Sequence, residues 1–173
     1  MSSLLPLPQH VYLDTNVIVY ALVRGMAHSD ICLDACQRLI DNGSSVYIAN
    51  LTRLEFLQAV RGLANSQSLP EDTRQKFGLD QWEDTVVREQ WFNFWTNQFD
   101  QFLDAFDVYH ELPYRPESWW HVSKTMADGP MAAYDAFHLS TAILYGISDL
   151  WTTDNGFSRA SGIQVALLHR ISR

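Results

Sequence analysis

Short apolar segments alternate with amphipathic ones along most of the chain. The runs HVYLD, SVYIAN, DLWTTD and GIQVALL are apolar and rich in β-branched or aromatic residues, which predicts buried strands, and a further strand is predicted around Phe106–His110. Between them, helical spacing of apolar residues predicts helices over about 16–23, 31–42, 52–66, 116–127 and 132–145. Strands that alternate with helices form parallel βαβ units. The pattern therefore predicts an α/β fold, a three-layer α/β/α sandwich around a central, mainly parallel sheet of four to five strands.

The segment from about 66 to 104 departs from this alternation. A polar, turn-rich stretch, SQSLPEDTRQKFGLD, precedes one long predicted helix with aromatic residues spaced along one side, namely Trp91, Phe94, Trp95, Phe99 and Phe102. Such a stripe is most often part of a core, and the alternative is an exposed surface for a partner helix or a second copy of the chain. We predict a single domain over residues 1–173 with an elongated, insertion-like helical region at about 66–104.

Composition indicates an ordinary globular protein, since 47% of its 173 residues are hydrophobic and 18% are charged. The segment MSSLLPLPQH lacks the basic region and apolar core of a signal peptide, and no apolar run reaches the roughly 20 residues that a membrane helix requires. We therefore expect a soluble, cytoplasmic protein with no membrane contact. Cys32 and Cys36, four residues apart on one helix face, are expected to be buried, reduced thiols.

The net charge of −8, from 12 Lys and Arg against 20 Asp and Glu, argues against high-affinity, nonspecific nucleic-acid binding. A local basic patch would still suffice to bind a nucleic acid. Candidates for such a patch, which are equally well explained as solvated surface charges, are Arg24, Arg53, Arg61 and Arg159.

Four acidic residues, Asp14, Glu55, Asp135 and Asp154, lie where a strand passes into a helix or just inside a helix. Each has a local explanation: a helix N-cap for Asp14, a capping box with Thr52 for Glu55, the helix dipole for Asp135 and a turn for Asp154. However, the carboxyl ends of parallel strands meet at one sheet edge, where ligands bind. Carboxylates gathered there would repel one another unless a hard cation lay between them. The sequence therefore predicts an acidic pocket.

The segments VYLDTNVIVY, LTRLEF, YDAFHLSTA and TTDNGF, in this order, resemble the PIN domain family and specifically its VapC-type toxin branch. The resemblance spans nearly the whole chain. It implies that the four acids are the catalytic ligands of one or two Mg²⁺ or Mn²⁺ ions. It also implies supporting roles for Thr15 and Asn16, and for Thr152 as a hydroxyl near metal-bound water or phosphate. The six histidines share no ligand spacing, and only His138, one helical turn after Asp135, is expected near the site.

The resulting hypothesis is a Mg/Mn-dependent endoribonuclease that hydrolyses RNA phosphodiester bonds with metal-activated water. The VapC-type resemblance further implies the toxin of a type II toxin–antitoxin pair, with RNA as substrate, a small antitoxin protein as partner and a homodimer as the assembly. One alternative is a non-catalytic PIN-like interaction module. Another is a phosphatase with Asp14 as nucleophile, although D-T-N lacks a second aspartate two residues on to act as general acid.

Overall fold

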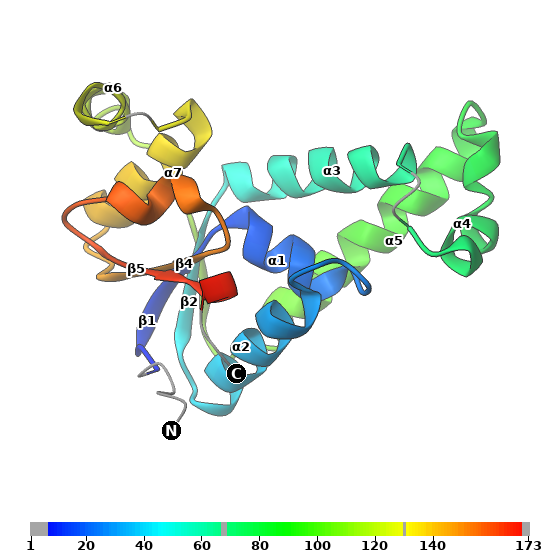
Figure 1. Cartoon of the computed structure of the whole chain (residues 1–173), viewed down its shortest axis with the longest axis horizontal. Coiled ribbons are helices and arrows are strands. Elements are labelled where there is room, and N and C mark those ends of the chain that lie inside the picture. Colours follow the sequence, from blue (N-terminus) through cyan, green and yellow to red (C-terminus); the bar gives the residue numbers. More distant parts are fainter. Residues whose placement is uncertain (1–6, 67–68, 130, 171–173) are drawn as a thin grey trace.

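A five-stranded, all-parallel sheet forms the centre of the molecule (Figure 1). The computed structural model describes residues 7–66, 69–129 and 131–170. The strands are ordered β3-β2-β1-β4-β5 across the sheet. Their bounds are β1 His10–Leu13, β2 Ser45–Ala49, β3 Tyr109–Leu112, β4 Asp149–Thr152 and β5 Gln164–Leu167. The predicted α/β fold with a parallel central sheet is confirmed.

Helices cover both faces of the sheet (Figure 1). One face packs on helices α1 Thr15–Leu22, α2 Ser29–Asp41, α3 Leu51–Ala64 and α5 Thr85–Asp104. The other face packs on α7 Ala133–Leu144, which in turn packs on α6 Ser118–Asp128. Successive strand residues point to opposite faces of the sheet. Val11 and Leu13 are therefore buried in the core on the α1 side, and Tyr12 is buried in the core on the α7 side. Both faces are buried, which explains why the strands read as continuous apolar runs.

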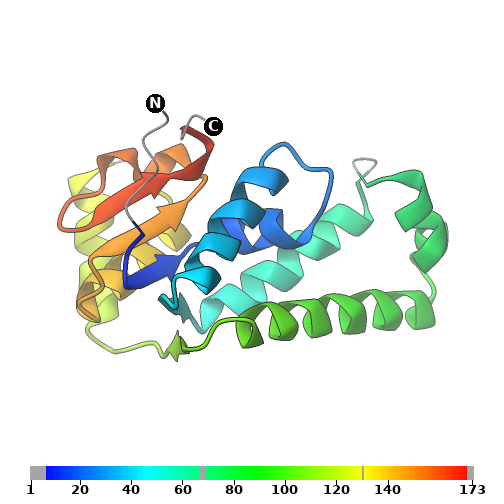
Figure 2. The same cartoon turned by 90° about the horizontal axis from the view of Figure 1, so that it is seen from below.

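Helices α3 and α5 run antiparallel and extend beyond the sheet as an arm (Figures 1 and 2). The far end of this arm carries α4 Glu71–Phe77 and the short 3-10 helix η1 Leu79–Gln81. In the aromatic stripe of α5, Trp91, Trp95 and Phe99 are buried, and the Trp91 indole N–H donates to the Val60 carbonyl at 3.0 Å. The core interpretation of these three residues is confirmed. Phe94 and Phe102 are only partly buried against the same core.

Several element boundaries differ from those predicted. The third strand occupies Tyr109–Leu112 and not Phe106–His110, because Phe106 is buried in the core shared with α5 and its N–H continues the turn at the end of that helix. The stretch predicted to be turn-rich contains α4, which ends at Gly78 with a φ of 64°. Glycine favours this left-handed conformation, which stops the helix.

Two predicted helix starts also differ from the structure. Helix α2 begins at Ser29 and not at about residue 31, so Asp30 lies in its first turn. Pro116 precedes α6, whose N-cap is Glu117. The predicted turn after α6 includes Pro130, and the N-terminal segment includes residues 1–6; these positions lie outside the described residues.

Both cysteines are buried and free, and burial raises the pKa of the Cys32 thiol to about 12 and that of Cys36 still further. These thiols are therefore protonated and unreactive. None of the described helices is long and apolar enough to cross a membrane.

Two further 3-10 segments follow the last strands. Segment η2, Asn155–Arg159, comes directly after Asp154, and η3, Leu168–Arg170, follows β5. Segment η2 therefore begins beside the acidic residues at the sheet edge.

Candidate active site

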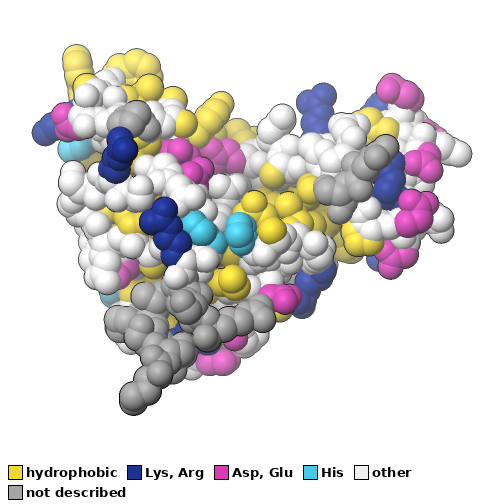
Figure 3. Space-filling view, in the orientation of Figure 1, with side chains coloured by type: hydrophobic (Ala, Val, Ile, Leu, Met, Phe, Trp, Pro, Cys, Tyr) yellow, Lys and Arg dark blue, Asp and Glu magenta, His cyan; other side chains and the backbone are white. Residues whose placement is uncertain are grey.

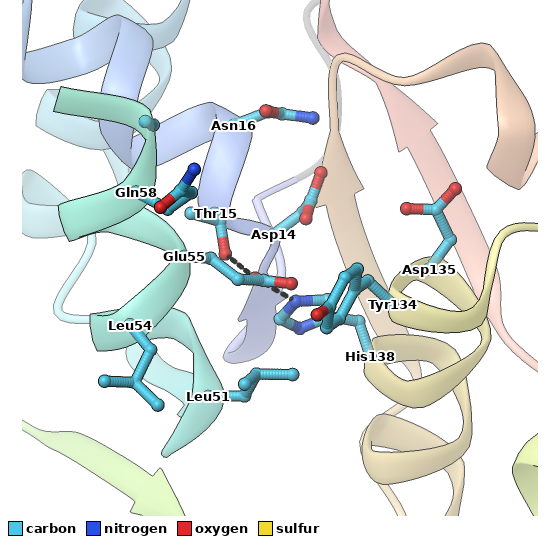
Figure 4. A pocket seen from close by; sticks show the side chains of 11 residues that line it. Asp14, Thr15, Asn16, Leu51, Leu54, Glu55, Gln58, Tyr134, Asp135 and His138 are labelled. Atoms are coloured by element: carbon cyan, nitrogen blue, oxygen red, sulfur yellow. Dashed lines mark hydrogen bonds and ion pairs between the residues drawn. The ribbon is translucent and has the colours of Figure 1, made fainter. Parts of the chain in front are cut away.

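The four predicted acids come from different elements that meet at the carboxyl edge of the sheet. Asp14 directly follows β1, Asp154 follows β4 by two residues, Glu55 lies on α3 and Asp135 begins α7. A cavity of about 680 Å³ opens between α3 and α7, and Asp14, Glu55 and Asp135 line it (Figure 4). Figure 3 shows the matching group of acidic side chains between the arm and the helices α6 and α7.

Asp14 is a buried carboxylate and not a working helix cap. It occupies the N-cap position of α1, but its side chain makes no capping hydrogen bond there. Its Oδ2 instead accepts a hydrogen bond from Thr152 Oγ1 at 2.7 Å, and only 3% of the residue is exposed. Burial raises the pKa of Asp14, an effect that the charge of His138 and the Thr152 hydrogen bond oppose. A carboxylate in this position requires a positive partner to offset its desolvation.

Thr152 connects Asp14 to Asp154. Its hydroxyl donates to Asp14 and accepts from the Asp154 backbone N–H at 2.9 Å, while the residue itself is fully buried. Asp154 in turn caps η2, accepting from the Gly156 N–H at 2.7 Å, so the predicted turn role is present alongside any role in the site. Thr152 therefore fixes the relative position of two acidic residues that are far apart in the sequence.

Asp135 and Asp154 lie on either side of Gly156. A Cβ atom at Gly156 would approach Asp135 Oδ2 and Asp154 Oδ1 to 3.2 Å each, so glycine is what lets both carboxylates approach this turn. Burial raises the pKa of Asp135 to about 6, with further contributions from the charges of Asp154 and Asp14. This repulsion between carboxylates is the electrostatic property that a bound cation would relieve.

Glu55 does not form the predicted capping box with Thr52. The N-cap of α3 is Asn50, and no side chain caps that helix. Glu55 Oε2 accepts a hydrogen bond from Thr15 Oγ1 at 2.5 Å and lies 2.6 Å from His138 Nε2. Burial alone would raise the pKa of Glu55, but the hydrogen bond and charge of His138 and the bond from Thr15 hold it below its ordinary value.

His138 joins α7 to the strand β1 and to α3. Its Nε2 contacts Glu55, its Nδ1 lies 2.6 Å from the Tyr12 hydroxyl, and only 1% of the residue is exposed. Burial alone would lower the pKa of His138, but the Glu55 hydrogen bond and the charges of Asp14 and Glu55 raise it. The sequence pointed to His138 through its spacing from Asp135, whereas Tyr12 was missed. The available signal was a hydroxyl in an otherwise apolar strand, two residues before Asp14.

The remaining lining residues differ in character. Thr15 and Asn16, the predicted supporting residues, both line the cavity; Thr15 is buried and bonded to Glu55, and Asn16 is exposed. Leu51 and two strongly exposed side chains, Leu54 (65%) and Tyr134 (64%), form an apolar part of the rim. The cavity thus has acidic residues at its bottom and apolar residues along part of its rim.

The donor chemistry of this edge fits a hard divalent cation, because it offers the buried carboxylate of Asp14 and the carboxylate of Asp135, which the charges of neighbouring acids repel. Within the described residues, however, no three His, Cys, Asp or Glu side chains are arranged to hold a metal ion. One Glu55 oxygen is already engaged by Thr15 and His138. The acids therefore gather at one edge without forming a finished coordination shell.

The fold and the site together define an α/β domain with an acidic pocket at the carboxyl edge of a parallel sheet. The PIN domain family model matches residues 11–163, and the chain belongs to the PIN domain family. The family membership predicted from the four acidic segments is confirmed.

Solved structures of similar fold include two from bacteria and one from Pyrobaculum aerophilum. One is the crystal structure of VapBC2 from Rickettsia felis bound to a promoter DNA fragment. Its sequence is 15% identical to this chain and its TM-score is 0.57, and the match covers 91% of this chain and 97% of that chain. FitAcB from Neisseria gonorrhoeae is 17% identical with a TM-score of 0.59, covering 92% and 99%. PAE2754 from Pyrobaculum aerophilum is 18% identical with a TM-score of 0.51, covering 99% and 97%. Comparison with curated protein sequences gave no match.

Proposed function

We propose that this protein is a Mg²⁺- or Mn²⁺-dependent endoribonuclease whose active site is the acidic pocket. The observation that carries the proposal is that a buried carboxylate, Asp14, lines one cavity with Asp135, whose pKa is raised to about 6 by burial and by the charges of neighbouring acids. Such mutual repulsion destabilises the fold unless a cation binds there. A site that is unfavourable without a cation is better explained by cation binding than by helix capping.

In this proposal, Asp14, Asp135 and Asp154 hold the cation, with Glu55 on the opposite wall. A bound divalent cation supplies an acidified water and neutralises charge on the phosphate. Thr152 and Gly156 keep the three aspartates close together. Thr15 and His138 hold Oε2 of Glu55, so Oε1 is the Glu55 atom that would be available to a bound cation.

We further propose that the protein is the toxin of a type II toxin–antitoxin pair, forming a homodimer and binding a small antitoxin. Support comes from the family membership and from the similar fold of VapBC2 and FitAcB. The net charge of −8 suits a basic antitoxin segment that reaches the acidic pocket, since complementary charge steers association. The long arm is a further place where a partner or a second copy would find a large surface.

The test is incubation of the purified protein with total RNA and Mg²⁺ or Mn²⁺, with cut sites mapped by sequencing. Asp14→Asn should abolish cleavage and weaken metal binding measured by calorimetry. Asp107→Asn is the matched control, because Asp107 is exposed and the charge change is the same. If Asp14→Asn cuts RNA and binds metal as well as the wild type does, the nuclease proposal fails and the interaction module becomes the better explanation.

A further inference from the structure

A second cavity, of about 330 Å³, lies on the other flank of α7 from the acidic pocket. Helix α6 contributes His121, Lys124, Thr125 and Asp128. Arg159 at the end of η2 and the residues that follow it up to Gly162 form a second part of the lining. Leu139 and Ile143 of α7, together with Gly129 and Met131, form the rest. Its volume is at the small end of the range for ligand pockets and leaves room for a phosphate group.

The charge of this cavity is opposite to that of the protein as a whole. Two cations and one histidine face a single acid, Asp128, whereas the chain carries a net charge of −8. Most Lys and Arg side chains of the described residues are engaged elsewhere: Arg53 and Arg74 in salt bridges, Arg88 and Arg170 in hydrogen bonds, Lys76 and Arg115 over aromatic rings.

Four cations have no hydrogen bond, ion pair or ring contact with other described residues. They are Arg24, Arg61, Lys124 and Arg159, and the last two line this one cavity from different elements. Both are exposed and therefore open to a ligand from solvent. Two unpaired cations that face a shared cavity form a site for an anion.

The cavity is connected to the acidic pocket through two elements. Asp154 is the N-cap of η2 and Arg159 is its last residue, and a 3-10 helix advances about 2 Å per residue, so the backbone rises roughly 10 Å between them. Helix α7 carries Asp135 towards the acidic pocket and Leu139 towards the second cavity. Figure 3 shows Lys and Arg side chains on the same face as the acidic group. A strand with one phosphate at the acids would therefore have this cavity within reach of another of its phosphates.

We propose that Lys124 and Arg159 form a phosphate-binding subsite that holds the RNA backbone beside the scissile bond. The subsite rests on the proposed nuclease function for its substrate class. It gives the strand a fixed direction across Asp135, because the phosphate subsite lies on one flank of α7 and the apolar rim with Tyr134 on the other.

The test compares two double variants that each remove two unpaired positive charges. Lys124→Gln/Arg159→Gln removes the proposed subsite, and Arg24→Gln/Arg61→Gln is the control, since neither of these arginines lines either cavity. Both are prepared in the full chain with Asp14 retained, and Ca²⁺ replaces Mg²⁺ so that a cation is present at the acids while the RNA stays intact. Binding of a fluorescein-labelled single-stranded RNA of mixed sequence is followed by anisotropy over a range of KCl concentrations.

The subsite variant should bind about tenfold more weakly than its parent, and the control less than about twofold. Its slope of log K against log[KCl] should decrease in magnitude by roughly 0.7 for each lost phosphate contact. Lys124→Arg/Arg159→Lys should retain the parental slope, because both charges remain. Equal effects of the two charge-removing variants, an unchanged slope, or no RNA binding by the parent would each overturn the proposal. If these shifts are seen but the protein never cuts RNA with Mg²⁺ or Mn²⁺, the subsite stands and the nuclease proposal fails.

Discussion

Replacing Asp135 by asparagine should stabilise the metal-free protein at neutral pH, although it removes a proposed metal ligand. The pKa of the Asp135 carboxyl is raised from 3.8 to about 6 by burial and by the charges of Asp154, Asp14 and Glu55. Above pH 6 the folded protein therefore carries a carboxylate where a neutral group would be more stable. Asparagine keeps the shape and removes the charge, so it should relieve this repulsion.

The size of the effect follows from the pKa difference. A carboxyl whose pKa rises by about 2 pH units on folding costs roughly 3 kcal/mol when ionised, at about 1.36 kcal/mol per unit. Asp135 is partly exposed, and water screens its interactions, so we expect a gain of about 1–2 kcal/mol in the free energy of unfolding.

The gain must depend on pH with a defined sign. Below pH 3.8 the carboxyl is protonated in both the folded and the unfolded protein, and the substitution should have little effect. Between 3.8 and about 6 the folded state holds the proton more tightly, so the wild type loses stability as the pH rises. Above about pH 6 the loss is complete, and the advantage of asparagine reaches its maximum.

Urea unfolding in EDTA, followed by tryptophan fluorescence at about pH 4 and about pH 7.5, measures this directly. Asp107→Asn is the control for a simple change of net charge, because Asp107 is exposed. Added Mg²⁺ should stabilise the wild type more than Asp135→Asn, since binding to the folded state raises its stability. The electrostatic argument is refuted if Asp135→Asn is no more stable than the wild type at about pH 7.5, or if its advantage is the same at both pH values.

Three further substitutions test other parts of the structure. His138→Ala should lower the free energy of unfolding by about 2–4 kcal/mol, because it leaves Glu55 without its buried partner. His138→Gln should recover part of that loss. Equal urea midpoints for the wild type and His138→Ala would contradict this prediction. Tyr134→Ala should change stability by less than about 0.5 kcal/mol but weaken RNA binding in the anisotropy assay by about 1–3 kcal/mol, as loss of a stacked base would; unchanged affinity excludes such stacking. Trp91→Ala should lower the free energy of unfolding, measured in urea, by about 3–5 kcal/mol, because it leaves a cavity in the core of the arm. A decrease below about 1 kcal/mol would mean that the arm contributes little to stability.

The fold could be predicted from the sequence because each buried strand is short, apolar and followed by a helix. This pattern located four strands to within a residue or two, including β1 before Asp14 and β4 before Asp154. The third strand was placed three residues early, since Phe106 is as apolar as a strand residue but is buried against α5. Local composition does not distinguish which core an apolar side chain enters.

Within the site, the sequence predicted which acids meet but not what holds them. Asp14, Glu55 and Asp135 line one cavity because parallel strands share their carboxyl edge. The contact of Glu55 with His138 depends on how α3 and α7 pack across that edge, which no local pattern encodes. The capping-box motif was consequently misread, since Glu55 bonds to Thr15 from another helix and not to its own N-terminus.

The distribution of charge reconciles an acidic protein with the polyanionic substrate that we propose for it. With a net charge of −8, the long-range field repels RNA, so electrostatic steering does not drive the encounter. Affinity must then come from short-range contacts: a cation among the aspartates, Arg159 at the end of η2, and Lys124 of α6 on the same cavity. An RNA that reaches only one of these would bind weakly, because the surrounding acids still repel it. Cleavage would thus require a strand that fits both at once, which favours selective cutting over general degradation.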